Sequence, residues 1–543
     1  MSEEELMSAE TEEIVLNVHS PVKQKVRRNV LFTIGARIGF FLSRMWIPPF
    51  VLGYMTLTVY GVWSSIFILV SYLGMSTMGI SNVYIKYIAE YNARREYQKA
   101  NELLSTGLLV TVPLCLALFT GMVAGWPWVA HWMKLTPVLE DQAREAVLIV
   151  VGVFLSSLSL TAFTDVLSGM QEIAAAQVIW IISYVAETIL IVVLVSRGRG
   201  LRGMAEAFLV RTILQIGLSA VWAFWKFKWM RISPRYFSRE SLKSVMHFGG
   251  LVQLQGMLSI FLGSVERLVG WQFIGLEASA LFDLAKKWPA SVAFVPTAFF
   301  AAIIPAASHV DAEGSLEQRR AHLQSLYMKG SRYANLCTAY FCGLMALLPG
   351  PIMRVWLARP LTDAVALFAI LTVATHFSML TGPGTSVLRG MARVYDEFFN
   401  SIPNLITLAI FLPLAHWYYG QWTPLGIGIS VLAASGCATV ALLLRVHHVL
   451  RIDWRAYTLK VLLPGLLPYG VAALIAWPVT RMVDSVTRWQ GVGVLVITGF
   501  CYSIICLLLI YGMFFDDSEK RQMVNIFNRL RRDVVPLGVE YEQ

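Results

Sequence analysis

The chain has 543 residues, of which 57% are hydrophobic and only 14% are charged, and its mean hydropathy is +0.61. Soluble domains carry about a quarter charged residues, so this composition excludes a soluble globular protein. The net charge of +10 does not indicate nucleic acid as a partner, because in a membrane protein excess lysine and arginine gather in the cytoplasmic loops.

The N-terminal segment, residues 1–28, is expected to be a cytoplasmic tail without a cleavable signal peptide. Its first 13 residues include six glutamates, a composition typical of disorder. The six cysteines of the chain fall in apolar stretches and show no C-x-x-C spacing. We therefore expect neither disulfides nor a bound metal, and no cofactor is predicted.

Apolar stretches long enough to cross a bilayer follow one another along the rest of the chain. Residues 147–163 and 178–195 are examples, each close to the ~20 apolar residues of a spanning helix. The alternating pattern of a membrane barrel does not occur, so we predict an all-α polytopic membrane protein. It has about 14 transmembrane helices, which start near residues 29, 58, 105, 143, 174, 204, 246, 278, 331, 361, 397, 423, 459 and 491.

The basic residues predict the orientation of these spans. If the N-terminus is cytoplasmic, 29 of the 44 lysines and arginines lie in cytoplasmic segments and 9 lie in the opposite loops. The positive-inside rule therefore places both termini in the cytoplasm. The loop at residues 196–203 goes against this trend because it carries three arginines on the outer side.

Two sequence echoes indicate an internal duplication. "VLSGM" (residues 166–170) recurs as "VLRGM" (residues 387–391), an offset of 221 residues. Gly53 and Tyr60 recur as Gly275 and Phe282, with an offset of 222. We predict two six-helix lobes in pseudo-twofold repeat plus an extra C-terminal helix pair. The expected parts after the tail are an N-lobe (29–226), a cytoplasmic linker (227–243), a C-lobe (244–448), the extra helices (449–514) and a cytoplasmic C-terminal tail (515–543).

Three stretches of the sequence carry a resemblance to a known group of transporters. They are "GISNVYIKYIAEYNARREYQKA", "LSGMQE" and "GSVERLVGWQFIGLEASALFDLAKK". In pattern and position the chain resembles the multidrug/oligosaccharidyl-lipid/polysaccharide (MOP) exporter superfamily, and within it the O-antigen-type flippases of lipid-linked oligosaccharides. The resemblance implies a two-lobed transporter of the bacterial inner membrane whose central cavity is lined mainly by spans one, two, seven and eight. The family often has an aspartate where this chain has Glu266, so the role of that acid is not carried over.

Six basic residues fall inside predicted spans, where charges normally face a water-filled cavity or a partner. They are Arg37, Arg44, Arg211, Arg267, Lys286 and Lys287. Counted along the helices at ~1.5 Å per residue, four of them lie about 12 to 14 Å below the outer surface. Arginine and lysine together suit phosphate oxygens. We predict a pyrophosphate-binding or other anion-binding site formed by Arg37, Arg44, Arg267, Lys286 and Lys287.

Acidic and amide groups near these residues have two interpretations. Asp283 is four residues before Lys287, so it either neutralises that lysine or takes part in ion coupling. The candidates for coupling to Na⁺ or H⁺ are Glu266, Asp283, Asn400 and Asn404, although hydrogen bonding between helices also explains the asparagines. Arg211 is expected to make a structural contact with Glu206 or Glu187.

The sequence contains no phosphate-binding loop and no hydrolase motif, so an enzyme is not predicted. The function favoured is a flippase for polyprenyl-pyrophosphate-linked oligosaccharide, a precursor of cell-surface polysaccharide, with the lipid carrier of the undecaprenyl type and membrane lipid as its partners. A polysaccharide polymerase or glycosyltransferase is a further expected partner. The alternatives are a non-transporting subunit of a polysaccharide synthase or export complex, and a multidrug/cation antiporter of the same fold.

Overall fold

The computed structural model describes residues 35, 39–75, 80–247, 250–312, 315–359, 361–484, 486–514 and 520. Arg37 lies outside the described residues. The chain divides into two compact units. Unit 1 comprises residues 1–284 and 418–427, and unit 2 comprises residues 285–417 and 428–543.

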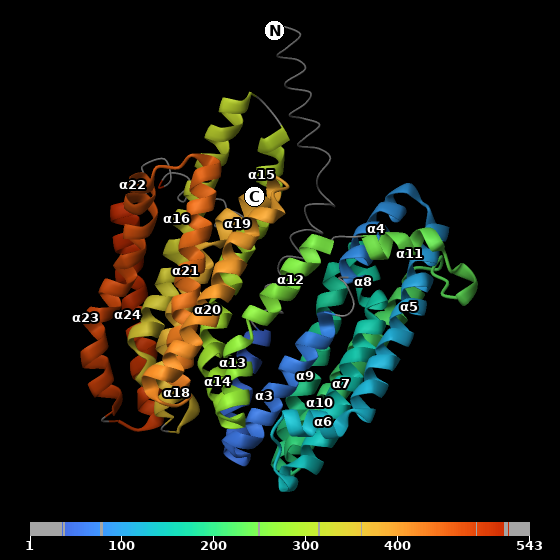
Figure 1. Ribbon diagram of the computed structural model, residues 1–543, viewed down its shortest axis with the longest axis horizontal. Helices are drawn as coiled ribbons and strands as arrows, with labels where there is room; N and C mark the ends of the chain where they lie inside the picture. The colour runs from blue at the N-terminus through green and yellow to red at the C-terminus, as the bar shows by residue number, and fades with distance from the viewer. Residues whose placement is uncertain are drawn as a thin grey trace, which may run out of the picture. The chain divides into compact units, whose positions relative to one another are not determined.

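Unit 1 begins with a helix at residues 39–54, and Figure 1 labels most of the helices that follow. In chain order they are α3 (Leu57–Gly74), α4 (Ile80–Arg94), α5 (Tyr97–Ala124), α6 (Trp126–Trp132), α7 (Pro137–Ser159), α8 (Thr161–Gly169), α9 (Ile173–Ser196), α10 (Gly200–Lys226), η2 (Pro234–Tyr236), α11 (Arg239–His247), α12 (Gly250–Leu262), α13 (Val265–Phe273) and α14 (Leu276–Val292), which continues into unit 2.

Unit 2 contains the rest of the helices. In chain order they are α15 (Phe294–Ala312), α16 (Leu316–Leu347), α17 (Pro349–Leu357), α18 (Thr362–Leu380), α19 (Gly382–Gly390), η3 (Val394–Glu397), α20 (Phe398–Tyr419), α21 (Pro424–Leu450), α22 (Trp454–Tyr457), the π-helical turn η4 (Thr458–Leu462), α23 (Leu463–Asp484) and α24 (Arg488–Phe514). The adjoining ends of α20 and α21, residues 418–427, belong to unit 1.

The predicted all-α polytopic membrane protein is confirmed. Among the described residues, 10 helices are long and apolar enough to cross a membrane, or 11 if α16 and α17, bent by 77°, form one broken span. This is fewer than the 14 predicted for the whole chain. The spans expected near residues 246 and 278 are divided into shorter helices, α12 with α13 and α14 with α15, and the first span falls partly on residues outside the description.

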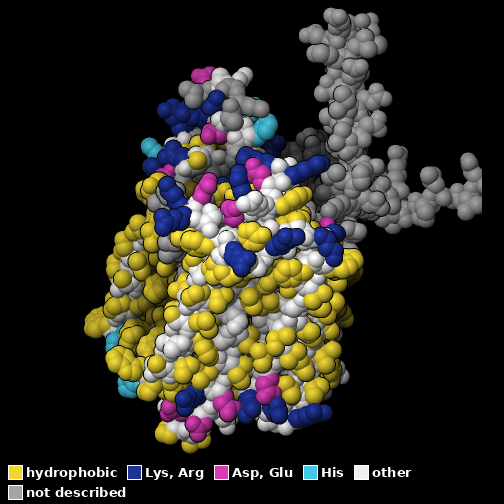
Figure 2. Space-filling view, turned by 90° about the vertical axis from the view of Figure 1, so that its right-hand side faces the viewer, with side chains coloured by type: hydrophobic (Ala, Val, Ile, Leu, Met, Phe, Trp, Pro, Cys, Tyr) yellow, Lys and Arg dark blue, Asp and Glu magenta, His cyan; other side chains and the backbone are white. Residues whose placement is uncertain are grey.

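The outer surface of unit 1 is suited to lipid. Figure 2 shows a broad hydrophobic surface that is bordered by charged side chains at both ends. Exposed side chains on α5 and α10 contribute to the apolar surface of this unit, among them Leu116, Val221 and Trp225. Apolar side chains are stable at this position only against hydrocarbon, because water would disfavour so large an exposed patch.

The predicted duplication is visible in the local structure of each unit. Helices α8 and α19 each have 9 residues and start 221 positions apart. Each is followed by a turn whose central residue, Gln171 or Ala392, has a left-handed backbone with φ of 58° or 57°. Both turns close with the same backbone bond of 2.8 Å, from Glu172 to Leu167 and from Arg393 to Leu388. The sequence echo therefore encodes one repeated helix-and-turn motif.

The order of elements around these motifs also recurs. In unit 1 a long α5, a short α6, a long α7 and the short α8 precede α9 and α10. In unit 2, α16 to α21 repeat this order, and α23 and α24 follow as an additional pair. Gly169 at the end of α8 packs on Ile88 of α4, and Gly390 at the end of α19 packs on Ala307 of α15. Small residues allow this close helix contact in both units.

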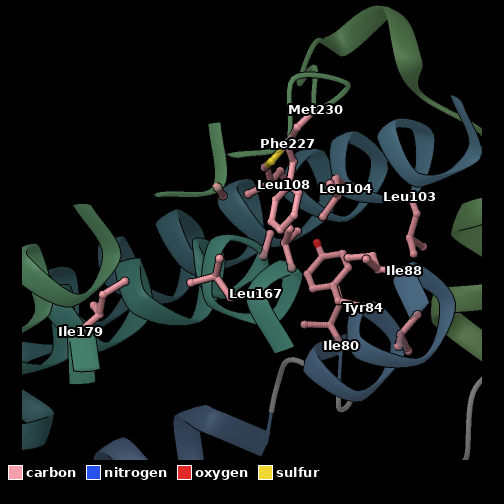
Figure 3. Close-up of a cluster of buried hydrophobic side chains, with 14 residues drawn as sticks. Ile80, Tyr84, Ile88, Leu103, Leu104, Leu108, Leu167, Ile179, Phe227 and Met230 are labelled. Atoms are coloured by element: carbon pink, nitrogen blue, oxygen red, sulfur yellow. The ribbon is translucent and has the colours of Figure 1, made fainter. Parts of the chain in front are cut away.

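A cluster of buried apolar side chains holds α4, α5 and α8 together in unit 1 (Figure 3). Tyr84 of α4 packs among Leu104, Leu167 and Phe227 and is completely buried. Its hydroxyl lies so close to Gly107 of α5 that any side chain at that position would collide with it. This packing fixes α4, the next helix after α3 in the chain, and α3 carries the polar residues described next.

Candidate functional site

A polar seam joins α3 to the first half of α14 inside unit 1. The hydroxyl of Ser279 lies 2.8 Å from that of Ser64 and 3.0 Å from that of Ser65. Gly61 lets α14 approach closely, because a side chain at this position would collide with the backbone of Leu276. Residues four positions apart share a helix face, so the seam aligns the next polar residues on both helices.

The next residues along this seam are Tyr60 on α3 and Asp283 on α14. The Tyr60 hydroxyl donates a hydrogen bond of 2.7 Å to Oδ2 of Asp283. The other carboxylate oxygen, Oδ1, lies 3.5 Å from Nη1 of Arg267 on α13. The side chains of Arg267 and Asp283 are only 18% and 16% exposed, so each charge needs the other as a partner.

A second ion pair lies in unit 1 and involves the helix at residues 39–54. Nη2 of Arg44 is 3.5 Å from Oε2 of Glu187 on α9, whose side chain is only 1% exposed. The guanidinium also lies over the rings of Phe40 and Tyr184, at 5.2 and 5.4 Å from their centres. Both Arg44 and Arg267 lie within electrostatic range of the Tyr60 hydroxyl. One tyrosine therefore lies in the positive field of two arginines from separate helices.

The predicted partner of Arg211 is wrong. Nη1 of Arg211 donates to the Tyr184 hydroxyl at 2.6 Å, and its guanidinium lies 4.4 Å from the centre of the Phe208 ring. Of the two expected carboxylates, Glu187 pairs with Arg44, and Glu206 pairs with two arginines at the start of α10. A planar guanidinium that stacks on aromatic rings needs less charge compensation than an ammonium would.

The other predicted site residues have the following positions. Lys286 and Lys287 are half-buried on α14, where the chain passes into unit 2. Glu266 is buried on α13 in unit 1. Asn400 and Asn404 are half-buried, one turn apart, on α20 in unit 2. In the described part of the chain, no group of three or more His, Cys, Asp or Glu side chains is placed to hold a metal ion.

Two residues of this site were missed at the sequence level. The position of Tyr60 was noted only as part of the repeat, and Glu187 was considered only as a partner for Arg211. Their partners lie 223 and 143 residues away in the chain, a separation that no local pattern reveals. The available signal was a carboxylate within an apolar span, which needs a cation nearby.

Unit 2 has a polar cluster of a different kind. His376 on α18 makes hydrogen bonds through both ring nitrogens, at 2.7 Å to the Tyr469 hydroxyl and 2.8 Å to Oδ1 of Asn335. The amide nitrogen of Asn335 donates to the carbonyl of Val461 in the π-helical turn. These bonds connect α16 and α18 to the additional helix α23. His376 is therefore packed within unit 2.

No family model matches the chain. Among curated proteins it is similar to the uncharacterized membrane protein EpsK of Bacillus subtilis (strain 168), with 21% identity over 510 residues that cover 90% of this chain and 94% of EpsK.

Solved structures of transporters share the fold. The lipid II flippase MurJ in an inward closed conformation matches with a TM-score of 0.65 at 14% identity, covering 89% of this chain and 98% of MurJ. An inward-facing multidrug resistance transporter of the MATE family matches with a TM-score of 0.61 at 16% identity, covering 78% of this chain and 94% of the transporter. The chain thus shares the fold of these transporters, one of which is described as a member of the MOP superfamily that the sequence resembles.

Proposed function

We propose that the chain is a flippase that moves polyprenyl-pyrophosphate-linked oligosaccharide from the cytoplasmic to the outer leaflet of a bacterial inner membrane. The lobes at residues 29–226 and 244–448 alternate access to the substrate, and both termini are cytoplasmic. One observation carries the proposal. Arg44 and Arg267, on different helices and both within electrostatic range of Tyr60, are each paired with a carboxylate.

The two ion pairs explain how buried arginines remain stable when no substrate is bound. An unpaired guanidinium would be costly at this burial, and Glu187 and Asp283 remove that cost. Both contacts measure 3.5 Å, longer than the 2.7 to 2.9 Å of a strong charge-assisted bond. A pyrophosphate offers more oxygens to each guanidinium and can replace the carboxylate. The carboxylates are therefore resident anions that the substrate displaces.

This exchange also provides a route for ion coupling. When the substrate takes Arg267, the carboxylate of Asp283 loses this ion pair and keeps the hydrogen bond from Tyr60. A buried carboxylate in that position gains from binding H⁺ or Na⁺. Glu266, buried on the same helix as Arg267, is the second coupling candidate. We assign Asn400 and Asn404 to helix contacts or ion coupling in unit 2.

The other residues of the predicted anion site are neighbours of these residues in the sequence. Lys286 and Lys287 follow Asp283 on α14, and Arg37 comes seven residues before Arg44. The fold of the lipid II flippase MurJ supports a lipid-linked substrate, since that protein has the same architecture over most of this chain. A polysaccharide polymerase or glycosyltransferase that supplies or consumes the oligosaccharide is the expected partner.

The test is binding of a polyprenyl-pyrophosphate sugar to purified variants in nanodiscs. Each charge-assisted contact to phosphate is worth roughly 1.5 to 3 kcal/mol, so Arg267→Ala should weaken binding about tenfold to a hundredfold. Arg267→Lys should restore only part of it, because the two-pronged contact is lost. Asp283→Asn should strengthen binding, because it removes the competing anion.

The carboxylate variant separates this function from a purely structural ion pair. If the pair only supports the fold, Asp283→Asn and Arg267→Ala should both weaken binding and lower stability together. Arg202→Ala, in an exposed ion pair with Glu145, is the matched control and should bind normally. Equal affinity in the wild type and in Arg44→Ala/Arg267→Ala would contradict the anion site and favour a non-transporting subunit.

A further inference from the structure

A second basic region lies at one end of unit 2, where α17 ends and α18 and α24 begin. A pocket of about 540 Å³ opens there. Three arginines are among the residues that line it, Arg354 on α17, Arg359 after it, and Arg488 at the start of α24. The pocket is at the opposite end of α18 from the turn that follows α19, and the predicted orientation makes this the outer end.

The arginines are unusual for that end of the protein. The positive-inside rule leaves outer loops poor in basic residues. The C-terminal half has four basic residues in its predicted outer loops, Arg354, Arg359, Arg481 and Arg488. Three of these four line one pocket, and they come from segments about 130 residues apart in the chain. Such convergence indicates a binding site more than a scattered surface charge.

The contacts of two arginines fix them at the pocket wall and leave donors available. Arg488 donates through Nε to the carbonyl of Val355 and through Nη2 to that of Trp356, both at 2.9 Å. Arg354 uses Nη1 to bind Oδ1 of Asp484 at 2.7 Å. A guanidinium has five N–H donors, so each keeps at least two for a ligand. The carbonyl bonds hold Arg488 in place without neutralising its charge.

The backbone adds to the positive potential. Thr362 at the first turn of α18 and Thr487 just before α24 both line the pocket, so two helix N-termini are close to it. Helix N-termini carry a partial positive charge and favour anions. Two carboxylates are nearby, Asp484 in its pair with Arg354 and Asp363 in the first turn of α18, and neither lines the pocket. Positive charge exceeds negative charge at this wall.

We propose that this pocket binds a phosphoryl group at the outer surface of the membrane. The planar donors of arginine fit phosphate oxygens, and the pocket is large enough for a pyrophosphate or a phospholipid headgroup. The proposal goes beyond the transport function and does not depend on it, because all the residues that carry it lie within unit 2. The phosphoryl group comes either from a lipid headgroup or from a phosphate in solution.

Binding of inorganic pyrophosphate to the full-length protein in phosphatidylcholine nanodiscs tests the pocket. Arg354→Gln/Arg359→Gln should weaken binding at least tenfold. Arg481→Gln is the matched control, because Arg481 is on α23 near the same end, stacks on Trp477 at 4.0 Å and does not line the pocket. The same three binding measurements are repeated in protein that also carries Arg44→Ala/Arg267→Ala. Without the interior arginines, the remaining pyrophosphate binding reports on the pocket alone, so loss of binding at the pocket and at the interior site can be told apart.

A second experiment distinguishes a lipid headgroup from a phosphate in solution as the source of the phosphoryl group. Native mass spectrometry would count phosphatidylglycerol retained by the wild type and by Arg354→Gln/Arg359→Gln. Loss of one retained lipid in the variant assigns the pocket to a headgroup, and equal retention with weaker pyrophosphate binding assigns it to phosphate in solution. Equal pyrophosphate affinity in the wild type and the double variant, or an equal loss in Arg481→Gln, would overturn the proposal.

Discussion

The polar clusters described above for the two units differ in charge. Unit 1 buries two ion pairs, Arg44 with Glu187 and Arg267 with Asp283, each with a contact of 3.5 Å. In unit 2 the cluster of His376, Asn335 and Tyr469 is neutral, and the carboxylates buried elsewhere in that unit pair with arginines at shorter contacts of 2.6 to 2.7 Å. Both clusters connect helices that lie far apart in the sequence, so the difference concerns what each cluster can exchange with a ligand.

The neutral cluster is satisfied by its own members. Asn335 donates its amide to Val461, so its Oδ1 is free to accept the Nε2 proton of His376. The Nδ1 atom then accepts the hydroxyl proton of Tyr469. This fixes the tautomer and joins α23 to α16 and α18. The ion pairs of unit 1 instead have long contacts of 3.5 Å, so an anionic ligand can replace the carboxylate as the partner of each arginine. We therefore expect the unit 1 pairs to take part in ligand binding and the neutral cluster of unit 2 to hold helices together.

The largest expected effect comes from breaking an ion pair in unit 1. Arg44→Ala leaves the carboxylate of Glu187 buried without its cation, since Glu187 is only 1% exposed. The free energy of unfolding should fall by about 3 kcal/mol. Adding Glu187→Gln should recover at least about 1 kcal/mol, because the uncompensated charge is removed. Unfolding by sodium dodecyl sulfate in mixed micelles measures both.

The control for this prediction is an ion pair at the surface. Arg202 is 54% exposed and pairs with Glu145 and Glu206, so Arg202→Ala should lower stability much less than Arg44→Ala does. If Arg44→Ala has an effect as small as Arg202→Ala, or if Glu187→Gln adds to the loss, the buried pair does not require charge balance and the contrast with unit 2 fails.

Unit 1 also contains a carboxylate, Asp165, whose partners are hydroxyl groups and not arginines, and its titration makes the stability of the protein depend on pH. Asp165 on α8, beyond the end of span α7, accepts hydrogen bonds from Ser81 and Thr161, and burial raises the pKa of its carboxyl to about 6. The folded state therefore holds a proton that the unfolded state releases between pH 4 and 6. Stability falls as pH rises through this range.

Substitution of this acid should remove the pH dependence. Relative to Asp165→Asn, the wild type should lose about 2 kcal/mol of unfolding free energy between pH 4 and 7. The difference between the two proteins cancels the titration of all other groups. A wild type that gains stability relative to the variant as pH rises would show that the two hydroxyls outweigh burial and hold the carboxylate ionised.

The sequence predicted the repeated parts of the fold better than their contacts. The echo at an offset of 221 corresponds to the same turn at Gln171 and Ala392, because a short motif encodes a local backbone path. The break between α12 and α13 was not predicted, since hydropathy does not detect an interruption between two apolar helices. The pairing of Arg44 with Glu187 depends on tertiary packing, which charge counting cannot provide.

The smallest expected effect is in the neutral cluster of unit 2. Tyr469→Phe removes the donor to Nδ1 of His376 without changing the ring that stacks on the imidazole. The loss should be about 1 kcal/mol, the usual net value of a neutral hydrogen bond. Tyr395→Phe, at a tyrosine that is 71% exposed, is the control and should leave stability unchanged.

A double-mutant cycle of Tyr469→Phe with His376→Ala should show a coupling energy of similar size, because the two residues share one hydrogen bond. Hydrogen exchange of α23 should rise in both single variants if the cluster holds this helix to α16 and α18. If α23 exchanges normally while stability falls, the cluster supports packing elsewhere in unit 2, and its role in anchoring the additional helix pair is wrong.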